Sequence, residues 1–257
     1  MIKPKVLVLK AAGINCDAET AFAFESAGAQ TEFVHINQLV SGGKRLADYQ
    51  VFVLSGGFTY GDDIAAGKIL ANELKFKLFD AIKDFVAAGK LIIGICNGFQ
   101  VLVRAGILPG HIDFEQEVTL TNNDSGVFQD RWVYLKNAAS PCIWTKGLPE
   151  VIYLPIAHGE GKFIPKNEDV LERLRRQGQI VFTYCDSRGQ SGDYPVNPNG
   201  SIDSIAGICD TTGRVLGLMP HPERHIISLQ HPRWTREGLK KHGDGFAIFL
   251  NAVHFFK

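Results

Sequence analysis

Cysteine is scarce in this sequence of 257 residues and shows no pairing pattern. This excludes domains stabilised by disulfides and domains stabilised by zinc. The chain has five cysteines, an odd number, and none of them lies in a C-x-x-C pair. A disulfide framework uses an even set of cysteines, and a structural zinc site uses closely spaced pairs. We therefore expect reduced thiols at all five positions: Cys16, Cys96, Cys142, Cys185 and Cys209.

The sequence also lacks long apolar runs and has no net charge of either sign. The longest uncharged, mostly apolar stretch, Leu91–Val103, contains Asn97 and Gln100 and is too short and too polar to span a bilayer. Only four apolar residues in a row precede Lys10, fewer than a secretory signal needs. Lysine and arginine together number 27, as do aspartate and glutamate, so no net charge attracts nucleic acid or anionic lipid. We expect a cytoplasmic protein with no nucleic-acid or membrane partner.

Nucleotide-binding motifs are absent as well. Gly67-Lys68 and Gly89-Lys90 both lack the upstream glycine and the following serine or threonine of a phosphate-binding loop, and no G-x-G-x-x-G occurs. The sequence therefore gives no support for ATP or NAD chemistry in this chain, and we expect no cofactor here.

Apolar runs that alternate with helical patterns are what the first part of the chain does contain. Runs of this kind predict buried strands that form a parallel sheet covered on both faces by helices. Gly28 is expected to end the first helix, because glycine commonly follows a helix C-terminus. The predicted strands are Lys5–Leu9, Thr31–Ile36, Val51–Leu54 and Leu91–Ile95, and the predicted helices are Asp17–Ala27, one long helix from about Gly67 to Ala88, and Phe99–Ala105.

The remainder of the chain has a different character, with shorter strand-like runs between about Phe114 and Phe182. We interpret this part as a small antiparallel addition to one edge of the same domain, which would span residues 1–257. Ser204–Cys209 and Arg214–Met219 flank a turn-forming segment and predict a hairpin. Gly245–Phe256 has one apolar face and predicts a closing helix.

The candidate nucleophile is Cys96, at the centre of Gly94-Ile-Cys-Asn-Gly98, which follows a predicted strand and precedes a predicted helix. This G-x-C-x-G pattern is the cysteine counterpart of the serine nucleophile elbow, in which glycines allow a sharp turn and a close approach of the chains. At a helix N-terminus, free N–H groups and the helix dipole favour a thiolate. The other four cysteines lack this setting and are predicted to be core residues.

A cysteine nucleophile needs a proton acceptor, and His221 is the leading candidate. It follows a predicted strand in Pro220-His-Pro-Glu223, and the carboxyl ends of parallel strands meet in one crevice. Glu223 is close enough in the chain to orient the imidazole. His158 is the main rival as the base. Metal ligation by His221 and His225 is disfavoured, because Pro222 interrupts a helical spacing and no third ligand is evident.

Attack on an amide carbonyl also needs hydrogen-bond donors for the developing oxyanion. The backbone N–H of Asn97, directly after the nucleophile, is one candidate. A second is the segment Ser55-Gly56-Gly57-Phe58, again at the end of a predicted strand, although this segment is equally well explained as a plain turn.

Taken together, these segments resemble the class I (triad) glutamine amidotransferases. The sequence is more narrowly similar to the glutaminase subunits of phosphoribosylformylglycinamidine synthase, a purine-pathway enzyme. The narrower resemblance covers most of the chain. It rests on Gly13-x-Asn-Cys-Asp17, Ser55-Gly-Gly-Phe-x-Tyr-Gly-Asp62, Pro155-Ile-Ala-His-Gly-Glu-Gly161, Asn197-Pro-Asn-Gly-Ser201 and Met219-Pro-His-Pro-Glu-Arg224.

The resemblance implies a flavodoxin-like fold and a division of labour among site residues. It implies that Cys96 attacks the side-chain amide of glutamine to form a thioester, that His221 moves the proton, and that Glu223 orients His221. It further implies oxyanion donors at Gly57 and Asn97. Glutamine would be held by Gly56, Gly57 and Gln100.

The resemblance also implies partners. Ammonia would pass to a synthetase subunit that uses ATP and Mg²⁺, and a small third subunit would bridge the two. Two features depart from the usual family pattern: Ile64-Ala65 replaces Leu-Arg, and a basic segment, residues 231–244, adds length. We interpret that segment as a solvated loop. Two other classes stay open on the residues alone, namely a stand-alone cysteine hydrolase or peptidase and a non-enzymatic binding module.

Overall fold

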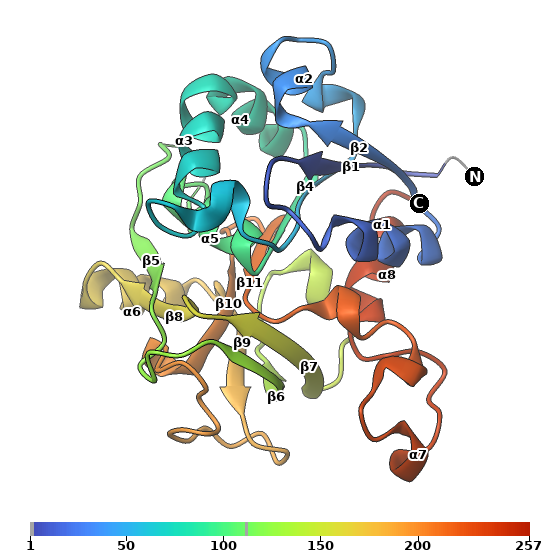
Figure 1. The fold of residues 1–257 in the computed structure, drawn as a ribbon, viewed down its shortest axis with the longest axis vertical. Coiled ribbons are helices and arrows are strands. Elements are labelled where there is room, and N and C mark those ends of the chain that lie inside the picture. Colours follow the sequence, from blue (N-terminus) through green and yellow to red (C-terminus); the bar gives the residue numbers. More distant parts are fainter. Residues whose placement is uncertain (1–2, 111–112) are drawn as a thin grey trace.

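The computed structural model describes residues 3–110 and 113–257, which form two β-sheets and the helices around them (Figure 1). The strands are β1 (Lys5–Lys10), β2 (Gln30–His35), β3 (Val51–Leu54), β4 (Leu91–Ile95), β5 (Val118–Thr121), β6 (Gln129–Asn137), β7 (Val151–His158), β8 (Lys162–Pro165), β9 (Ile180–Cys185), β10 (Ile205–Cys209) and β11 (Val215–Leu218). The α-helices are α1 (Asp17–Ser26), α2 (Ile36–Val40), α3 (Lys68–Lys77), α4 (Phe79–Ala87), α5 (Asn97–Arg104), α6 (Glu168–Arg176), α7 (Trp234–Glu237) and α8 (Phe246–His254).

The main sheet has nine strands in the order β2-β1-β3-β4-β11-β10-β9-β6-β7. The five strands from β2 to β11 are parallel, and β4 lies between β3 and β11. From β10 onward the pairing is antiparallel, and β5 and β8 form a separate two-stranded antiparallel sheet. The predicted α/β class with an antiparallel addition at one edge is confirmed, as is the β10–β11 hairpin.

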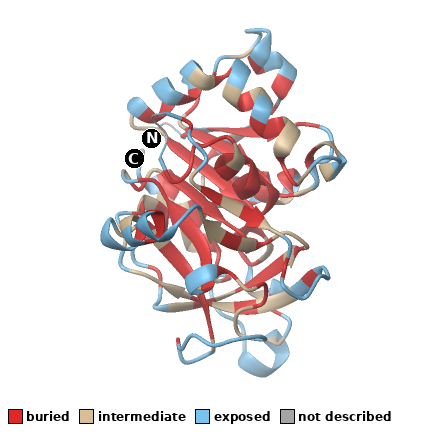
Figure 2. Cartoon of the chain, turned by 90° about the vertical axis from the view of Figure 1, so that its left-hand side faces the viewer, coloured by how far each residue is buried: buried red, intermediate tan, exposed pale blue. Residues whose placement is uncertain are grey.

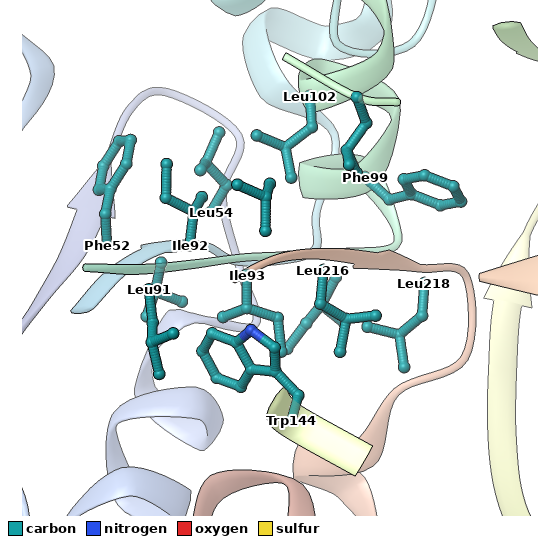
Figure 3. Packing of buried hydrophobic residues seen from close by; sticks show 14 of the residues in the cluster. Phe52, Leu54, Leu91, Ile92, Ile93, Phe99, Leu102, Trp144, Leu216 and Leu218 are labelled. Atoms are coloured by element: carbon teal, nitrogen blue, oxygen red, sulfur yellow. The ribbon is translucent and has the colours of Figure 1, made fainter. Parts of the chain in front are cut away.

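Apolar side chains on both faces of the parallel strands explain why helices cover both sides. Alternate residues of a strand point to opposite faces, so Ile92 packs toward α5 and Ile93 packs away from it (Figure 3). Trp144, from the short helix Ile143–Thr145, fills the face opposite α5. The buried residues are concentrated in the strands of the sheet (Figure 2). Along the described residues, no helix combines the length and apolar character that crossing a membrane requires.

Three details of the sequence prediction were wrong. The long helix expected from about Gly67 to Ala88 is two helices, α3 and α4, separated at Leu78, whose φ of −127° is not helical. Strand β7 was not predicted because Pro155 lies within it; the strand tolerates proline since it is the outermost strand of the sheet. Helix α6 was also not predicted. Only three of its residues are apolar and buried, and the rest of the segment is highly charged.

The basic segment 231–244 contains α7, which projects from the body of the molecule (Figure 1). Arg233 pairs with Glu237, and Lys240 pairs with Asp244. His231 is an exception to the expected solvated loop, because it is buried against the rings of Trp132 and Tyr153.

Candidate active site

Cys96 occupies the tight turn between β4 and α5. Its φ of +51° and ψ of −107° lie outside the regions that ordinary side chains prefer. The turn is fixed to the neighbouring strand, because the Cys96 N–H donates to the Leu218 carbonyl oxygen at 2.8 Å. The expected elbow is therefore present, with the thiol at the N-terminus of α5 and at the carboxyl end of β4.

Two glycines make this turn sterically feasible. A Cβ atom at Gly98 would lie 1.9 Å from the Leu54 carbonyl oxygen, and one at Gly94 would lie 2.6 Å from the Gly98 carbonyl oxygen. Both obstacles are backbone atoms, so no side-chain rotation relieves them. The spacing G-x-C-x-G thus follows from the closeness of β4, β3 and α5.

Gly98→Ala is expected to destabilise the fold by about 3 kcal/mol, because overpacking against fixed backbone must displace α5 or β3. Gly110→Ala is the matched control, since a Cβ at Gly110 meets no atom within 4 Å; its effect should stay within about 1 kcal/mol. Urea unfolding of the two variants measures the difference. Equal stability of both variants would refute this account of the elbow.

His221 and Glu223 follow β11 and face the elbow. His221 Nδ1 lies 2.6 Å from Glu223 Oε1, and both side chains are almost completely buried. Burial disfavours the charged imidazole, but the nearby Glu223 and Cys96 charges outweigh burial and hold the pKa of His221 well above its usual value. His221 Nε2 is buried and makes no hydrogen bond within the described part of the chain. This nitrogen is free to exchange a proton with a reacting group.

The two expected oxyanion donors both lie beside Cys96. Gly57 is paired with Ile14 in an isolated bridge whose hydrogen bonds are made by the flanking residues: Phe58 N–H donates to the Gly13 carbonyl, and Asn15 N–H donates to the Gly56 carbonyl. The bridge therefore leaves the Gly57 N–H unused. Asn97 is the first residue of α5, so its N–H has no partner within the helix.

The side chains of Asn97 and Gln100 connect the loops around the thiol. Asn97 Nδ2 donates to Gln100 Oε1 at 2.9 Å, and Asn97 Oδ1 accepts from the Thr59 hydroxyl at 2.7 Å. Gln100 Nε2 donates to the Glu160 carbonyl at 2.6 Å. Because these amides are paired with one another and with backbone, they fix the 57–62 and 157–161 segments against α5.

A small pocket of about 140 Å³ opens at this point. Cys96, Gly57 and Gln100 line it together with Phe58 and Phe128. The two phenylalanine rings lie 6.4 Å apart at the mouth and are about half exposed. The volume is well below that of pockets for drug-sized molecules and suits a ligand of amino-acid size. Three larger pockets of the described chain lie away from the thiol.

His158, the rival base, also lines this pocket, but its environment differs from that of His221. Burial, with a smaller contribution from the His221 charge, lowers the pKa of His158 to about 3. Its Nδ1 lies 3.1 Å from Asn123 Oδ1, a neutral amide, and its ring packs tightly over Gly161. His158 therefore stays neutral near pH 7 and is a poor proton acceptor.

Cys16 is a site neighbour that the sequence analysis treated as a core residue. It is buried as expected, yet its sulfur, a nitrogen of His221 and a carboxylate oxygen of Glu223 all lie within 4.8 Å of one another. The signal in the sequence was the segment Gly13-x-Asn-Cys-Asp17, which supported the family resemblance without having a role. His225, by contrast, directs its Nδ1 to the Tyr153 carbonyl.

A thiol on an elbow, with an imidazole and a carboxylate at the carboxyl ends of adjacent parallel strands, is typical of cysteine-nucleophile hydrolases on α/β folds. Comparison with known proteins narrows the class. The CobB/CobQ-like glutamine amidotransferase domain matches residues 3–256, and the chain belongs to this family. The resemblance drawn from the sequence is thereby confirmed.

Relatives are similar over their whole length. A phosphoribosylformylglycinamidine synthase subunit PurQ from Dehalococcoides mccartyi is 51% identical, with 98% of each chain covered. One from Methanococcus maripaludis is 47% identical, with 100% of this chain and 99% of the relative covered. A chain in the solved structure of PurLQS from Thermotoga maritima superposes with a TM-score of 0.77 at 31% identity and covers 100% of both chains.

Proposed function

We propose that this chain is the glutaminase subunit of phosphoribosylformylglycinamidine synthase in purine biosynthesis. It hydrolyses glutamine to glutamate and supplies the ammonia to an ATP-dependent synthetase. The observation that carries the proposal is the convergence of Cys96, His221 and Glu223 beside a small pocket with unused N–H donors. Full-length identity to subunits of that name supports the choice of this synthase. The family match over residues 3–256 supports one domain that spans the chain.

In the proposed reaction the Cys96 thiolate attacks the side-chain amide carbon of glutamine. The N–H groups of Gly57 and Asn97 bind the oxyanion that forms, because they are held in place and lack other partners. His221 gives its Nε2 proton to the departing nitrogen, which leaves as ammonia. A γ-glutamyl thioester remains on Cys96.

Water then completes the cycle. The neutral His221 takes a proton from the water molecule that attacks the thioester, and glutamate leaves as the thiolate and imidazolium are restored. Glu223 holds Nδ1 throughout, so that Nε2 is the nitrogen that exchanges the proton. Gly56 and Gln100 shape the pocket that holds glutamine: Gly56 by close packing against the His221 ring, Gln100 by fixing the Glu160 carbonyl.

We place ATP, Mg²⁺ and the ammonia acceptor on a synthetase subunit, with a small third subunit that bridges the two. The similarity to a chain of the PurLQS structure supports partners of this kind. Within this chain, Phe58, Phe128 and Ile64 are exposed apolar side chains on loops near the pocket mouth. We propose that the synthetase covers these three side chains. Ile64 takes the position at which other members of the family have a leucine.

Glutamine labelled with ¹⁵N in its amide group tests the function. With the synthetase and bridging subunits present, we expect the label in the amidine product, since ammonia is passed within the complex. The chain alone should release labelled ammonia slowly, because without a partner the pocket mouth beside the half-exposed Phe58 and Phe128 stays open to water. An unlabelled product, or full hydrolysis by the chain alone, would instead favour a stand-alone cysteine hydrolase.

A further inference from the structure

Cys16 lies at the start of α1, and its sulfur is close to His221 and Glu223. Its N–H donates to the Gly56 carbonyl at 3.2 Å, which joins α1 to the loop after β3. A Cβ atom at Gly56 would lie 2.9 Å from His221 Cε1, 3.2 Å from the Cys16 sulfur and 3.5 Å from Cys96 Cβ. Only the missing side chain at residue 56 allows the imidazole and both cysteines to come together.

The sulfur of Cys16 has its own hydrogen-bond partners, which fix its position. It donates to Asn15 Oδ1 at 3.1 Å and accepts from Arg224 Nη2 at 3.2 Å. Arg224 is in turn held by Glu19, one turn further along α1, at 2.9 Å. Arg224 follows His221 by three residues, so these contacts tie the turn that carries the base to the start of α1.

We propose that Cys16 is a positioning residue for His221. Its sulfur, held by Arg224, lies within 4.8 Å of an imidazole nitrogen and supports the ring together with Glu223, so that Nε2 stays directed toward Cys96. A polarisable sulfur beside the ring also favours the imidazolium, the form that donates the proton to the leaving ammonia. This inference rests on the proposed glutaminase function. It gives the base, His221, a second positioning residue besides Glu223.

A plain core cysteine is the competing explanation, and the surroundings of the sulfur argue against it. A core thiol needs only apolar contacts, whereas the Cys16 sulfur contacts an arginine and an asparagine and lies beside a buried histidine. Within the described residues, the titratable groups that act on His221 are Glu223, Cys96, Cys16 and His158, and Arg224 lies behind the Cys16 sulfur. Burial lowers the pKa of His221, and the Glu223 and Cys96 charges raise it by more; the Cys16 sulfur adds a smaller effect in the raising direction.

Cys16→Ala in the assembled complex provides the test, with glutamine hydrolysis measured from pH 5 to pH 10. We expect kcat to fall about tenfold with KM nearly unchanged, because glutamine binding does not involve the sulfur. Without the sulfur the imidazolium loses support and the pKa of His221 falls, so the high-pH limb of the kcat profile should move to lower pH. Cys16→Ser, which retains a donor and acceptor, should restore most of the rate.

Cys142→Ala is the matched control, because Cys142 is equally buried and directly precedes the short helix Ile143–Thr145, outside the site. Its kcat and pH profile should match those of the unchanged chain. If Cys16→Ala fails to fold, Asn15→Ala keeps the thiol but removes the neutral amide oxygen that accepts its hydrogen bond, and the limb should move the same way. An unmoved profile in both variants would overturn the positioning role. Absence of glutamine hydrolysis in the unchanged complex would instead overturn the proposed function.

Discussion

Replacing Cys96 by alanine abolishes glutamine-dependent synthesis by the complex while ammonia-dependent synthesis continues. Without the sulfur no thioester forms, and the loss in rate of glutamine hydrolysis should reach at least about 10⁴-fold. The ammonia-dependent rate should survive, because the proposed function places the synthetase chemistry on another subunit. The amidine product is measured with glutamine and then with an ammonium salt as the nitrogen source.

The design of this test uses the buried position of Cys96. Cys96 is only 5% exposed, and its thiol lies 3.6 Å from the Ala157 carbonyl oxygen, so the smaller alanine fits without disturbing the elbow. Cys142→Ala again serves as the control and should retain both activities. Loss of both activities in Cys96→Ala, with normal assembly, would contradict the division of labour between subunits.

The sequence predicts the catalytic geometry well because backbone sterics determine it. The glycines two residues before and after Cys96 are required by contacts below 3 Å with backbone atoms, so their spacing carries structural information directly. His221 was found for a similar reason, since it follows an apolar run that ends at the same edge of the sheet as β4. The locations of residues that directly follow parallel strands can thus be inferred from the apolar runs in the sequence.

Interactions between segments distant in the chain could not be inferred in this way. Cys16 and Arg224 are 208 residues apart, and no local pattern indicates that the arginine reaches the sulfur. Strand β7 was hidden by Pro155, whose cost depends on whether a neighbour pairs with that edge. The contrast between His158 and His221 also depends on long-range burial, because Asn123, the ring partner of His158, becomes known only from the fold.

Replacing His221 by alanine should lower glutamine hydrolysis by about three to four orders of magnitude, whereas His158→Ala should cost about tenfold or less. Both rings are buried, yet Glu223 and Cys96 oppose burial and raise the pKa of His221, while burial lowers that of His158 to about 3. Only His221 can therefore hold a proton near neutral pH and give it to the leaving ammonia. The rate of glutamate formation by the complex measures both variants.

A second readout separates the base from a residue that only shapes the pocket. Alkylation of Cys96 by iodoacetamide reports the thiolate, which a neighbouring imidazolium stabilises. His221→Ala should slow this alkylation below pH 8, because the positive charge is lost, whereas His158→Ala should leave its pH dependence unchanged, since His158 is neutral throughout that range. A large loss of glutamine hydrolysis in His158→Ala, with only a mild loss in His221→Ala, would identify His158 as the base. The contact between His221 and Glu223 would then have no role in catalysis.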